Sequence, residues 1–273
     1  MMLSFGSFQF DLSRPLVMGI VNVTPDSFSD GGRLGQSAID HAHQLIAEGA
    51  DIIDIGGEST RPGAIPVSLE EELSRVIPVI EALPGVPISI DTFKPEVMRA
   101  AILAGAQMVN DIDALQDPLA MQIVAASNVA VCLMHKRGAP QTMQVQPEYA
   151  DVLAEVNMFL RDRVAAVQAA GIAQDRIVVD PGFGFGKTLA HNLALLRELH
   201  HFTDLGVPVL AGLSRKSMLG ALTGQDASNR MPASIAAAII AVQRGAAIVR
   251  VHDVRATVDA LKILNAINGG CNE

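Results

Sequence analysis

Ionisable and amide side chains recur in this sequence directly after short apolar runs, at the points where strands would end. One such side chain can simply hydrogen-bond to the backbone of a loop. A whole set indicates a binding or catalytic site, because the carboxyl ends of the strands of a barrel converge on one rim. The set consists of Asn22, Asp54, Glu58, Asp91, Asn110, His135, Asp180, Ser214, Arg215, Lys216, Arg250 and His252.

Arg250 and His252 have the most specific chemistry of this set. They are two residues apart in an apolar run, so on a strand both side chains point the same way. A guanidinium beside an imidazole suits a phosphate or diphosphate group. The alternative is structural: Arg250 would pair with a carboxylate inside the fold, and His252 would be a hydrogen-bonding group.

The segment Gly212–Gly220 leads from an apolar run into the start of a helix. Backbone N–H groups in this segment, together with the Ser217 hydroxyl, would offer donors to an anion. Lys216 could reach inward to a carbonyl or a ring nitrogen. A solvated basic turn explains the segment equally well, so its interpretation depends on the other polar residues.

The glycine-spaced segment Asp180–Asn192 imitates nucleotide-binding motifs but fulfils none of them. A phosphate-binding P-loop requires glycine where Pro181 stands, and a dinucleotide fingerprint requires glycine where Lys187 stands. We therefore expect a flexible loop that exposes Phe183 and Phe185. The alternative is that these phenylalanines tuck into the rim of the fold.

Two further segments, Asn22–Gly32 and Gly56–Ala64, are rich in Gly, Pro, Ser and Asp. This composition is typical of lids that close over a substrate. Asn22 is a hard oxygen donor that suits Mg²⁺, an ion that binds few protein oxygens together with substrate phosphates and water. The histidines lack zinc-type spacing, and we expect most of them to be solvated: His41, His43, His135, His191, His200 and His201.

The composition restricts the class of protein. The formal net charge of −9 over 273 residues argues against nonspecific binding to nucleic acid or to anionic membranes. With 49% hydrophobic residues and no Trp, the core should be aliphatic, as in buried parallel strands. The two cysteines form no ligand pattern, and Cys132 should be a buried small hydrophobe. The N-terminus does not resemble a signal peptide, and Ala233–Val242 is too short to span a bilayer, so we expect a cytoplasmic protein.

After a hairpin-like opening segment, short apolar runs alternate with helical patterns along the chain. The predicted strands are Val17–Val23, Ile52–Ile55, Ile88–Ile90, Met108–Asn110, Val129–Met134, Ile177–Val179, Val207–Leu213 and Ala247–Val251. The predicted helices are Ser37–Glu48, Leu69–Ala82, Pro95–Ala104, Pro118–Ala126, Tyr149–Ala170, Leu189–Phe202, Ser228–Gln243 and Ala256–Ile267.

The order of these elements predicts the fold class. Prolines stand near helix starts, and glycines such as Gly49 and Gly105 follow helix ends, where a left-handed residue is often needed. Eight strand–helix units without a long linker favour a closed (β/α)8 TIM barrel over an open doubly wound sheet. We expect one α/β domain over residues 1–273, with an N-terminal hairpin in residues 1–14 and the barrel in residues 15–268.

Taken together, the motifs are similar to those of bacterial dihydropteroate synthases, a family of pterin-binding enzymes. The matching segments are MGIVNVTPDSFSDGG, DIGGESTRPGA, SIDTFKPEV, NDI, CLMH, DPGFGFGK, GLSRKSMLG and RVHDV. The resemblance implies condensation of (7,8-dihydropterin-6-yl)methyl diphosphate with 4-aminobenzoate, giving 7,8-dihydropteroate and diphosphate in folate biosynthesis. It further implies a Mg²⁺-assisted, SN1-like substitution, a homodimer, and competition by sulfonamides for the 4-aminobenzoate site.

The resemblance also implies a role for each matching residue. The pterin would be bound by Asp91, Asn110, Met134, Asp180 and Lys216. The diphosphate would be bound by Asn22, Thr60, Arg250 and His252, with Mg²⁺ on Asn22. The 4-aminobenzoate would be framed by Arg61, Pro62, Phe185, Lys216 and Ser217. The catalytic residues would be Asp91, Lys216, Arg250 and His252.

Two departures from the family pattern stand out. Asp113 follows NDI, where a basic residue is frequent, and Lys136 and Arg137 follow His135, where Met and Gln are more usual. Neither departure touches the main motifs. Two other functions stay open: a methyltetrahydrofolate-dependent methyltransferase barrel that works with a corrinoid partner, and a non-catalytic pterin-binding paralogue. The second would be favoured by loss of a diphosphate-binding residue.

Overall fold

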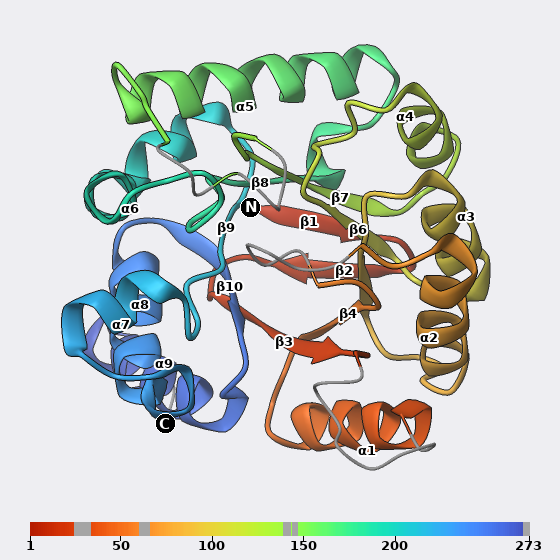
Figure 1. The fold of residues 1–273 in the computed structure, drawn as a ribbon, viewed down its shortest axis with the longest axis horizontal. Helices are drawn as coiled ribbons and strands as arrows, with labels where there is room; N and C mark the ends of the chain where they lie inside the picture. Colours follow the sequence, from red (N-terminus) through yellow and green to blue (C-terminus); the bar gives the residue numbers. More distant parts are fainter. Residues whose placement is uncertain (25–33, 60–65, 139–142, 144–146, 270–273) are drawn as a thin grey trace.

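Eight parallel strands form a closed barrel at the centre of the molecule (Figure 1). The computed structural model describes residues 1–24, 34–59, 66–138, 143 and 147–269. Around the barrel the strands follow the order β10-β3-β4-β5-β6-β7-β8-β9. Their bounds are β3 (Leu16–Asn22), β4 (Ile52–Gly56), β5 (Ile88–Asp91), β6 (Met108–Asp111), β7 (Ala130–Met134), β8 (Ile177–Asp180), β9 (Val209–Ala211) and β10 (Ala246–Val251).

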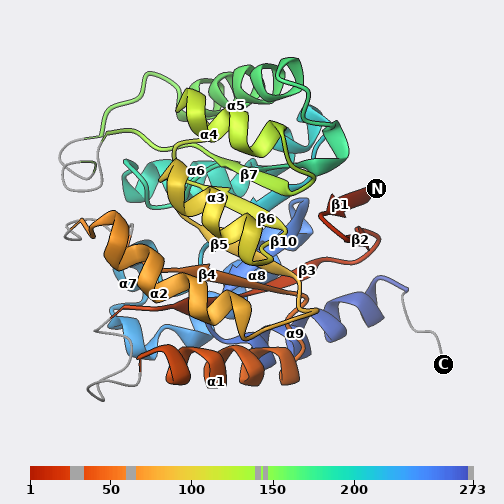
Figure 2. The ribbon, with the colours of Figure 1, turned by 90° about the vertical axis from the view of Figure 1, so that its right-hand side faces the viewer.

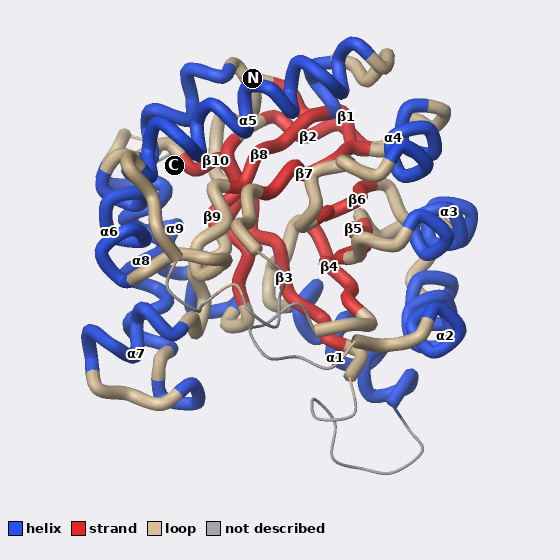
Figure 3. Tube along the Cα trace, turned by 45° about the horizontal axis from the view of Figure 1, so that its top comes forward, coloured by secondary structure: helices blue, strands red, loops and turns tan. Residues whose placement is uncertain are grey.

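Helices surround the barrel, so that each strand is packed between the barrel interior and the helical layer (Figure 3). Their bounds are α1 (Leu34–Ala47), α2 (Leu69–Glu81), α3 (Pro95–Ala104), α4 (Pro118–Ala125), α5 (Val152–Ala169), α6 (Leu189–Arg197), α7 (Ser217–Thr223), α8 (Met231–Gln243) and α9 (Val254–Ile267). Short 3-10 helices are η2 (Gln174–Arg176), η3 (Leu199–Leu205) and η4 (Ala227–Asn229). The predicted (β/α)8 barrel is confirmed, and all eight predicted strands are present.

Two helical predictions differ from the structure by more than a shift of up to three residues at a helix end. The pattern Leu189–Phe202 predicted one helix, but α6 ends at Arg197 and the chain continues as the 3-10 helix η3, which stops at the left-handed Gly206. The short helix α7 was absent from the predicted set of helices, although its start was expected near Ser217. Seven residues are too few to produce a periodic apolar pattern.

The two ends of the barrel interior differ in polarity. Apolar side chains from the amino-terminal parts of the strands fill that end of the barrel interior, which we call the lower interior. Cys132 is buried among them, as predicted. The antiparallel hairpin of β1 (Met2–Phe5) and β2 (Phe8–Asp11) lies at this end of the barrel (Figure 2). Its side chains Leu3 and Phe5 are fully buried in this cluster. Because the hairpin covers this end, substrates must enter from the carboxyl ends of the strands.

Within the described ranges, none of the helices combines the length and the apolar character needed to cross a membrane. The expected cytoplasmic location stays a prediction.

Phe5 anchors the hairpin, and its removal should destabilise the fold. Phe5 is fully buried in the lower cluster, so Phe5→Ala should lower the free energy of unfolding by about 3–5 kcal/mol. Met2→Ala on the same strand, where the side chain is half exposed, is the control and should cost about 1 kcal/mol or less. Denaturant titration measures both values. Equal effects of the two substitutions would show that the hairpin does not close the barrel.

Candidate active site

The strand register aligns several predicted site residues at the carboxyl end of the barrel. Asn22, Gly56, Asp91 and Asn110 lie side by side on the successive strands β3, β4, β5 and β6. On the next two strands, Met134 at the end of β7 is aligned with Asp180 at the end of β8. Closure of the barrel therefore brings together residues that are up to 158 positions apart in the sequence, from Asn22 to Asp180.

Arg250 joins the two sides of this mouth through ion pairs with buried carboxylates. Its Nε lies 2.5 Å from Asp54 Oδ2, and its Nη2 lies 2.7 Å from Asp91 Oδ2. Asn110 Nδ2 also donates to Asp54 Oδ2, at 3.3 Å. Burial alone would lower the pKa of Arg250, but the nearby carboxylates of Asp54 and Asp91 raise it above its usual value. Arg250 therefore stays charged inside the barrel.

The same carboxylates have unused hydrogen-bonding capacity. Within the described part of the chain, Asp54 Oδ1, Asp91 Oδ1 and Ser89 Oγ are buried and have no hydrogen-bond partner. Leaving a buried acceptor unpaired is costly, so such atoms in a mouth indicate that a ligand supplies the donors. Burial raises the pKa of the Asp91 carboxyl, and the positive charge of Arg250 opposes that shift. A ring that carries N–H groups fits this arrangement.

Asp180 and Lys216 converge on the opposite wall, around Gly212. A Cβ atom built on Gly212 would lie 3.8 Å from both Asp180 Oδ2 and Lys216 Nζ, and 3.9 Å from Arg250 Cβ. Lys216 Nζ donates to the Phe183 carbonyl and lies 4.7 Å from the centroid of the Phe185 ring. Burial lowers the pKa of Lys216 to about 8, opposed by Asp180, and burial raises the pKa of Asp180.

A strained turn after β9 aims Lys216 inward. Arg215 has a φ of +57°, which is unusual for a residue with a side chain. Its guanidinium donates to both carboxylate oxygens of Asp253, and its N–H donates to Ser234 Oγ at 2.9 Å. These contacts hold the backbone in its strained conformation. Arg215 is thus paired rather than solvated, contrary to one interpretation of the sequence.

His252 lies beside the same turn. Its Nδ1 is 3.0 Å from Ser214 Oγ, and its backbone N–H donates to that oxygen at 3.2 Å. Ser217 is the first residue of α7 and is exposed. Both structural alternatives raised for Arg250 and His252 therefore describe contacts that exist in this structure. Their predicted contacts with a diphosphate stay predictions.

The loop after β8 differs in part from its prediction. Phe183 was expected to be exposed but is fully buried, while Phe185 is half-buried beside Lys216. His135 was expected to be solvated, but it is only 6% exposed and its ring packs edge-on against Phe159. Both corrections have one cause: the loops after β7 and β8 pack on each other, a contact that local sequence patterns do not reveal.

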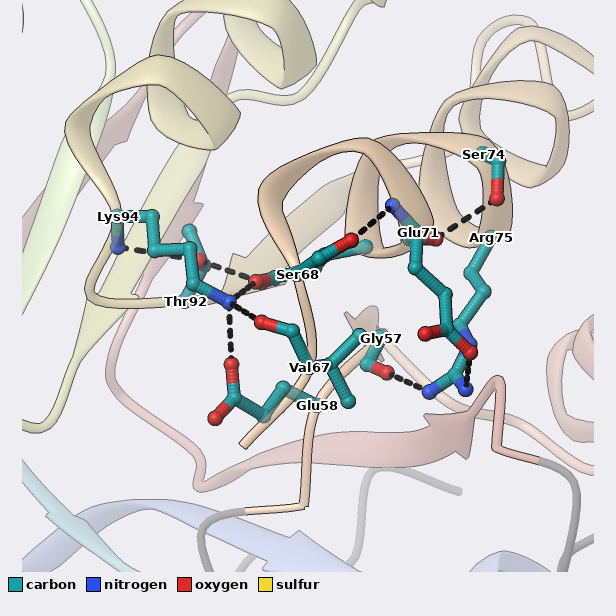
Figure 4. Close-up of polar contacts among 10 residues, drawn as sticks. Gly57, Glu58, Val67, Ser68, Glu71, Ser74, Arg75, Thr92 and Lys94 are labelled. Carbon is teal, nitrogen blue, oxygen red and sulfur yellow. Dashed lines mark hydrogen bonds and ion pairs between the residues drawn. The ribbon is translucent and has the colours of Figure 1, made fainter. Parts of the chain in front are cut away.

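Lys94 fixes both ends of the loop that follows β4 (Figure 4). Its Nζ lies 2.5 Å from Glu58 Oε2 at the start of that loop and donates to the Val67 carbonyl at its end, at 2.7 Å. The buried Glu72 accepts from Lys94 at 2.6 Å and from Thr92 at 2.7 Å. The predicted ligand-binding residues of this loop lie outside the described residues; they are Thr60, Arg61 and Pro62.

Two observations go beyond the sequence analysis. Asp54 was noted as a strand-end residue but was given no role, although it is the fully buried partner of Arg250. The sequence feature that could have indicated a role for Asp54 is its position as the one charged residue of the apolar strand IIDIG. Asp113 and Lys136, which are two of the departures from the family pattern, form an ion pair with each other. They therefore compensate one another at the rim.

Comparison with known proteins places the chain in a family. Residues 18–252 match the pterin-binding enzyme family. The chain is 52% identical over 261 residues to "Dihydropteroate synthase" of Escherichia coli (strain K12), covering 94% of this chain and 93% of that protein. The chain therefore belongs to the family of pterin-binding enzymes that includes the dihydropteroate synthases.

Solved structures give the same result. The structure of Xanthomonas albilineans dihydropteroate synthase with 4-aminobenzoic acid has a TM-score of 0.93 and 54% identity, over 98% of both chains. That of Burkholderia cenocepacia dihydropteroate synthase complexed with 7,8-dihydropteroate has a TM-score of 0.90 and 52% identity, over 98% of this chain and 96% of that chain.

Removal of Asp54 tests the ion pairs in the mouth. Asp54→Ala leaves the buried Arg250 with one carboxylate partner fewer, so the free energy of unfolding should fall by about 3 kcal/mol or more. Asp51→Ala is the control, because Asp51 precedes the same strand at the opposite end of the barrel and pairs with the exposed Arg14. It should cost about 1–2 kcal/mol, because Asp51 also accepts a hydrogen bond from the Val17 N–H at 2.8 Å. An Asp54→Ala protein as stable as the control would contradict this account of the mouth.

Proposed function

We propose that this chain acts as a dihydropteroate synthase. It would join the methyl carbon of (7,8-dihydropterin-6-yl)methyl diphosphate to the amine of 4-aminobenzoate, releasing diphosphate and a proton. The observation that carries the proposal is the mouth of the barrel, where buried carboxylates with unpaired oxygens lie beside the partly buried cations Arg250 and Lys216. The relatives that match nearly the whole chain bear the name of the synthase rather than that of a methyltransferase.

The dihydropterin ring fits the deep part of the mouth. Its amino and ring N–H groups are donors, which suit the oxygens of Asp91 and Asp180. Its carbonyl and ring nitrogens are acceptors, which suit the amide of Asn110 and the ammonium of Lys216. Met134 is buried at the end of β7, beside Asp180, and offers an apolar surface to the ring face.

The diphosphate would lie nearer the solvent, on Asn22, Thr60, Arg250 and His252. Asn22 ends β3, and its amide oxygen is a hard donor of the type that Mg²⁺ accepts. Among the described residues, no group of three or more His, Cys, Asp and Glu ligands occurs at the mouth. When bound, Mg²⁺ would neutralise charge on the leaving group.

The 4-aminobenzoate would bind beside Phe185 and Ser217, with Arg61 and Pro62 from the loop after β4. The proposed substitution is SN1-like: the carbon–oxygen bond to diphosphate breaks first, and the ring spreads the positive charge that develops. Asp91, held by Arg250 at 2.7 Å, supplies negative charge next to that cation. The arylamine is unprotonated at neutral pH and attacks without a strong base, which leaves Lys216 and His252 to bind and orient.

We propose further that the enzyme is a cytoplasmic homodimer. Several large apolar side chains of the neighbouring helices α7, α8 and α9 are exposed, and such a patch is typical of a protein interface. They are Leu222, Met231, Ile240, Ile263 and Ile267. The cytoplasmic location rests on the sequence features given above.

A direct assay tests the proposed function. Incubation of the protein with dihydropterin-methyl diphosphate, 4-aminobenzoate and Mg²⁺ should yield dihydropteroate and diphosphate in equal amounts. A chelator should abolish turnover, and added Mg²⁺ should restore it. Asp91→Asn and Lys216→Ala should each reduce turnover at least about a hundredfold, and sulfonamides should compete with 4-aminobenzoate. Normally folded variants with full turnover would refute the assigned roles.

The pH profile tests the role of Lys216. Burial lowers the pKa of Lys216 to about 8, so its ammonium is present below that pH and is lost as the pH rises through it. Because the ammonium donates to the pterin, kcat/KM for the dihydropterin diphosphate should fall about tenfold per pH unit above about 8. Lys216→Arg keeps its charge, so this alkaline loss should disappear. An unchanged profile in Lys216→Arg would assign the loss to another group.

A further inference from the structure

Lys187 is a buried lysine that has no part in the proposed reaction. It is 3% exposed and lies between the loops that follow β7 and β8. Its Nζ is 2.9 Å from the Gly182 carbonyl, 3.1 Å from the Phe185 carbonyl and 3.3 Å from the His135 carbonyl. The His135 Nδ1 atom lies 2.9 Å away on the remaining side.

These contacts are costly for a lysine. Within the described residues, Nζ makes no ion pair with a carboxylate. Burial lowers the pKa of Lys187 to about 7, and the negative charge of Asp180 opposes this shift. Burial together with the positive charge of Lys187 lowers the pKa of His135 to about 3, so the ring beside Nζ is neutral. A methionine would fill this space without the cost of burying an amine, so we look for a role in the hydrogen bonds that Lys187 donates.

The two loops that Lys187 joins approach each other through their backbones. A Cβ atom on Gly182 would lie 1.9 Å from the His135 carbonyl oxygen, and one on Gly186 would lie 2.3 Å from that of Arg137. Both glycines have positive φ, +71° and +64°. Only glycine allows such an approach. Lys187 supplies the donors for the carbonyl groups that this packing turns inward.

The loop held in this way presents two groups to Lys216. The Phe185 ring lies beside Lys216 Nζ, and the Phe183 carbonyl accepts a hydrogen bond from it. The backbone carbonyl of Phe185 accepts a hydrogen bond directly from Lys187 Nζ. The Gly184 N–H between the two phenylalanines donates to Asn192 Oδ1 at 2.7 Å.

We propose that Lys187 is a positioning residue for the synthase reaction: it fixes the loop Gly182–Gly186, so that the Phe185 ring frames the arylamine. The inference rests on the proposed function, because it assigns the arylamine to Phe185. Lys187 itself touches no substrate. Its effect should therefore fall mainly on recognition of 4-aminobenzoate.

Steady-state kinetics of Lys187→Met test this role. Loss of the hydrogen bonds from Lys187 Nζ to three backbone carbonyl groups should raise KM for 4-aminobenzoate about tenfold or more. KM for dihydropterin diphosphate should change by less than about threefold, because the carboxylates that bind the pterin are untouched. Lys262→Met, which alters an exposed lysine of α9, is the matched control and should change neither constant. A Lys187→Met enzyme with a lower melting temperature but unchanged KM values would overturn the proposal.

Two further measurements keep the inference decidable. Hydrogen exchange of the Gly182 and Gly184 amides should be at least about tenfold faster in Lys187→Met than in wild type, and exchange in β8 should be unchanged. This readout needs no turnover, so an inactive wild type would refute the synthase function and leave the loop to be judged by exchange alone. If Lys187→Met does not fold, His135→Phe removes one acceptor and keeps the lysine. It should raise KM for 4-aminobenzoate about threefold, and unchanged KM and exchange would overturn the proposal.

Discussion

The ion pairs of Arg250 with Asp54 and Asp91 are the interaction on which the mouth of the barrel depends. Each partner alone would be a buried charge with a large desolvation cost. Together they place one cation between two carboxylates, and the charge of Arg250 opposes the rise that burial causes in the pKa of Asp91. The two unpaired carboxylate oxygens make the mouth a receptor for donor groups. On the opposite wall, Asp180 and Lys216 likewise place an acidic and a basic side chain near each other.

This polar layer is possible because the rest of the barrel is closed and apolar. The hairpin and the amino-terminal part of the barrel interior form an apolar layer. The polar groups next to this layer therefore interact in surroundings of low polarity. Low polarity strengthens each ion pair and lowers the pKa of both buried lysines, Lys187 and Lys216. The two lysines differ in their neighbours. Lys216 lies close to Asp180 and points into the mouth, whereas Lys187 is surrounded by backbone carbonyl groups and an imidazole.

The sequence predicts the strands and the residues at their carboxyl ends, because both depend on local patterns. An apolar run that forms a buried strand, and the polar residue that follows it, can both be recognised from a few consecutive residues. Contacts between segments that are far apart in the sequence are not visible in this way, and the corrections at the site come from them. Phe183 and His135 are buried because the loops after β7 and β8 pack backbone to backbone. Asp54 received no role because its partner Arg250 is 196 residues away in the sequence.

Asp113 and Lys136, which both depart from the family pattern, lie in contact with each other in the fold. Each residue alone departs from the family pattern by a change of charge at the rim. The strands β6 and β7 are neighbours in the barrel, so the loops that follow them lie side by side, and the two charges form an ion pair. An acidic residue after β6 is therefore accommodated by a basic one after β7. Departures of this kind are correctly judged only in pairs, after the strand order has shown which loops meet.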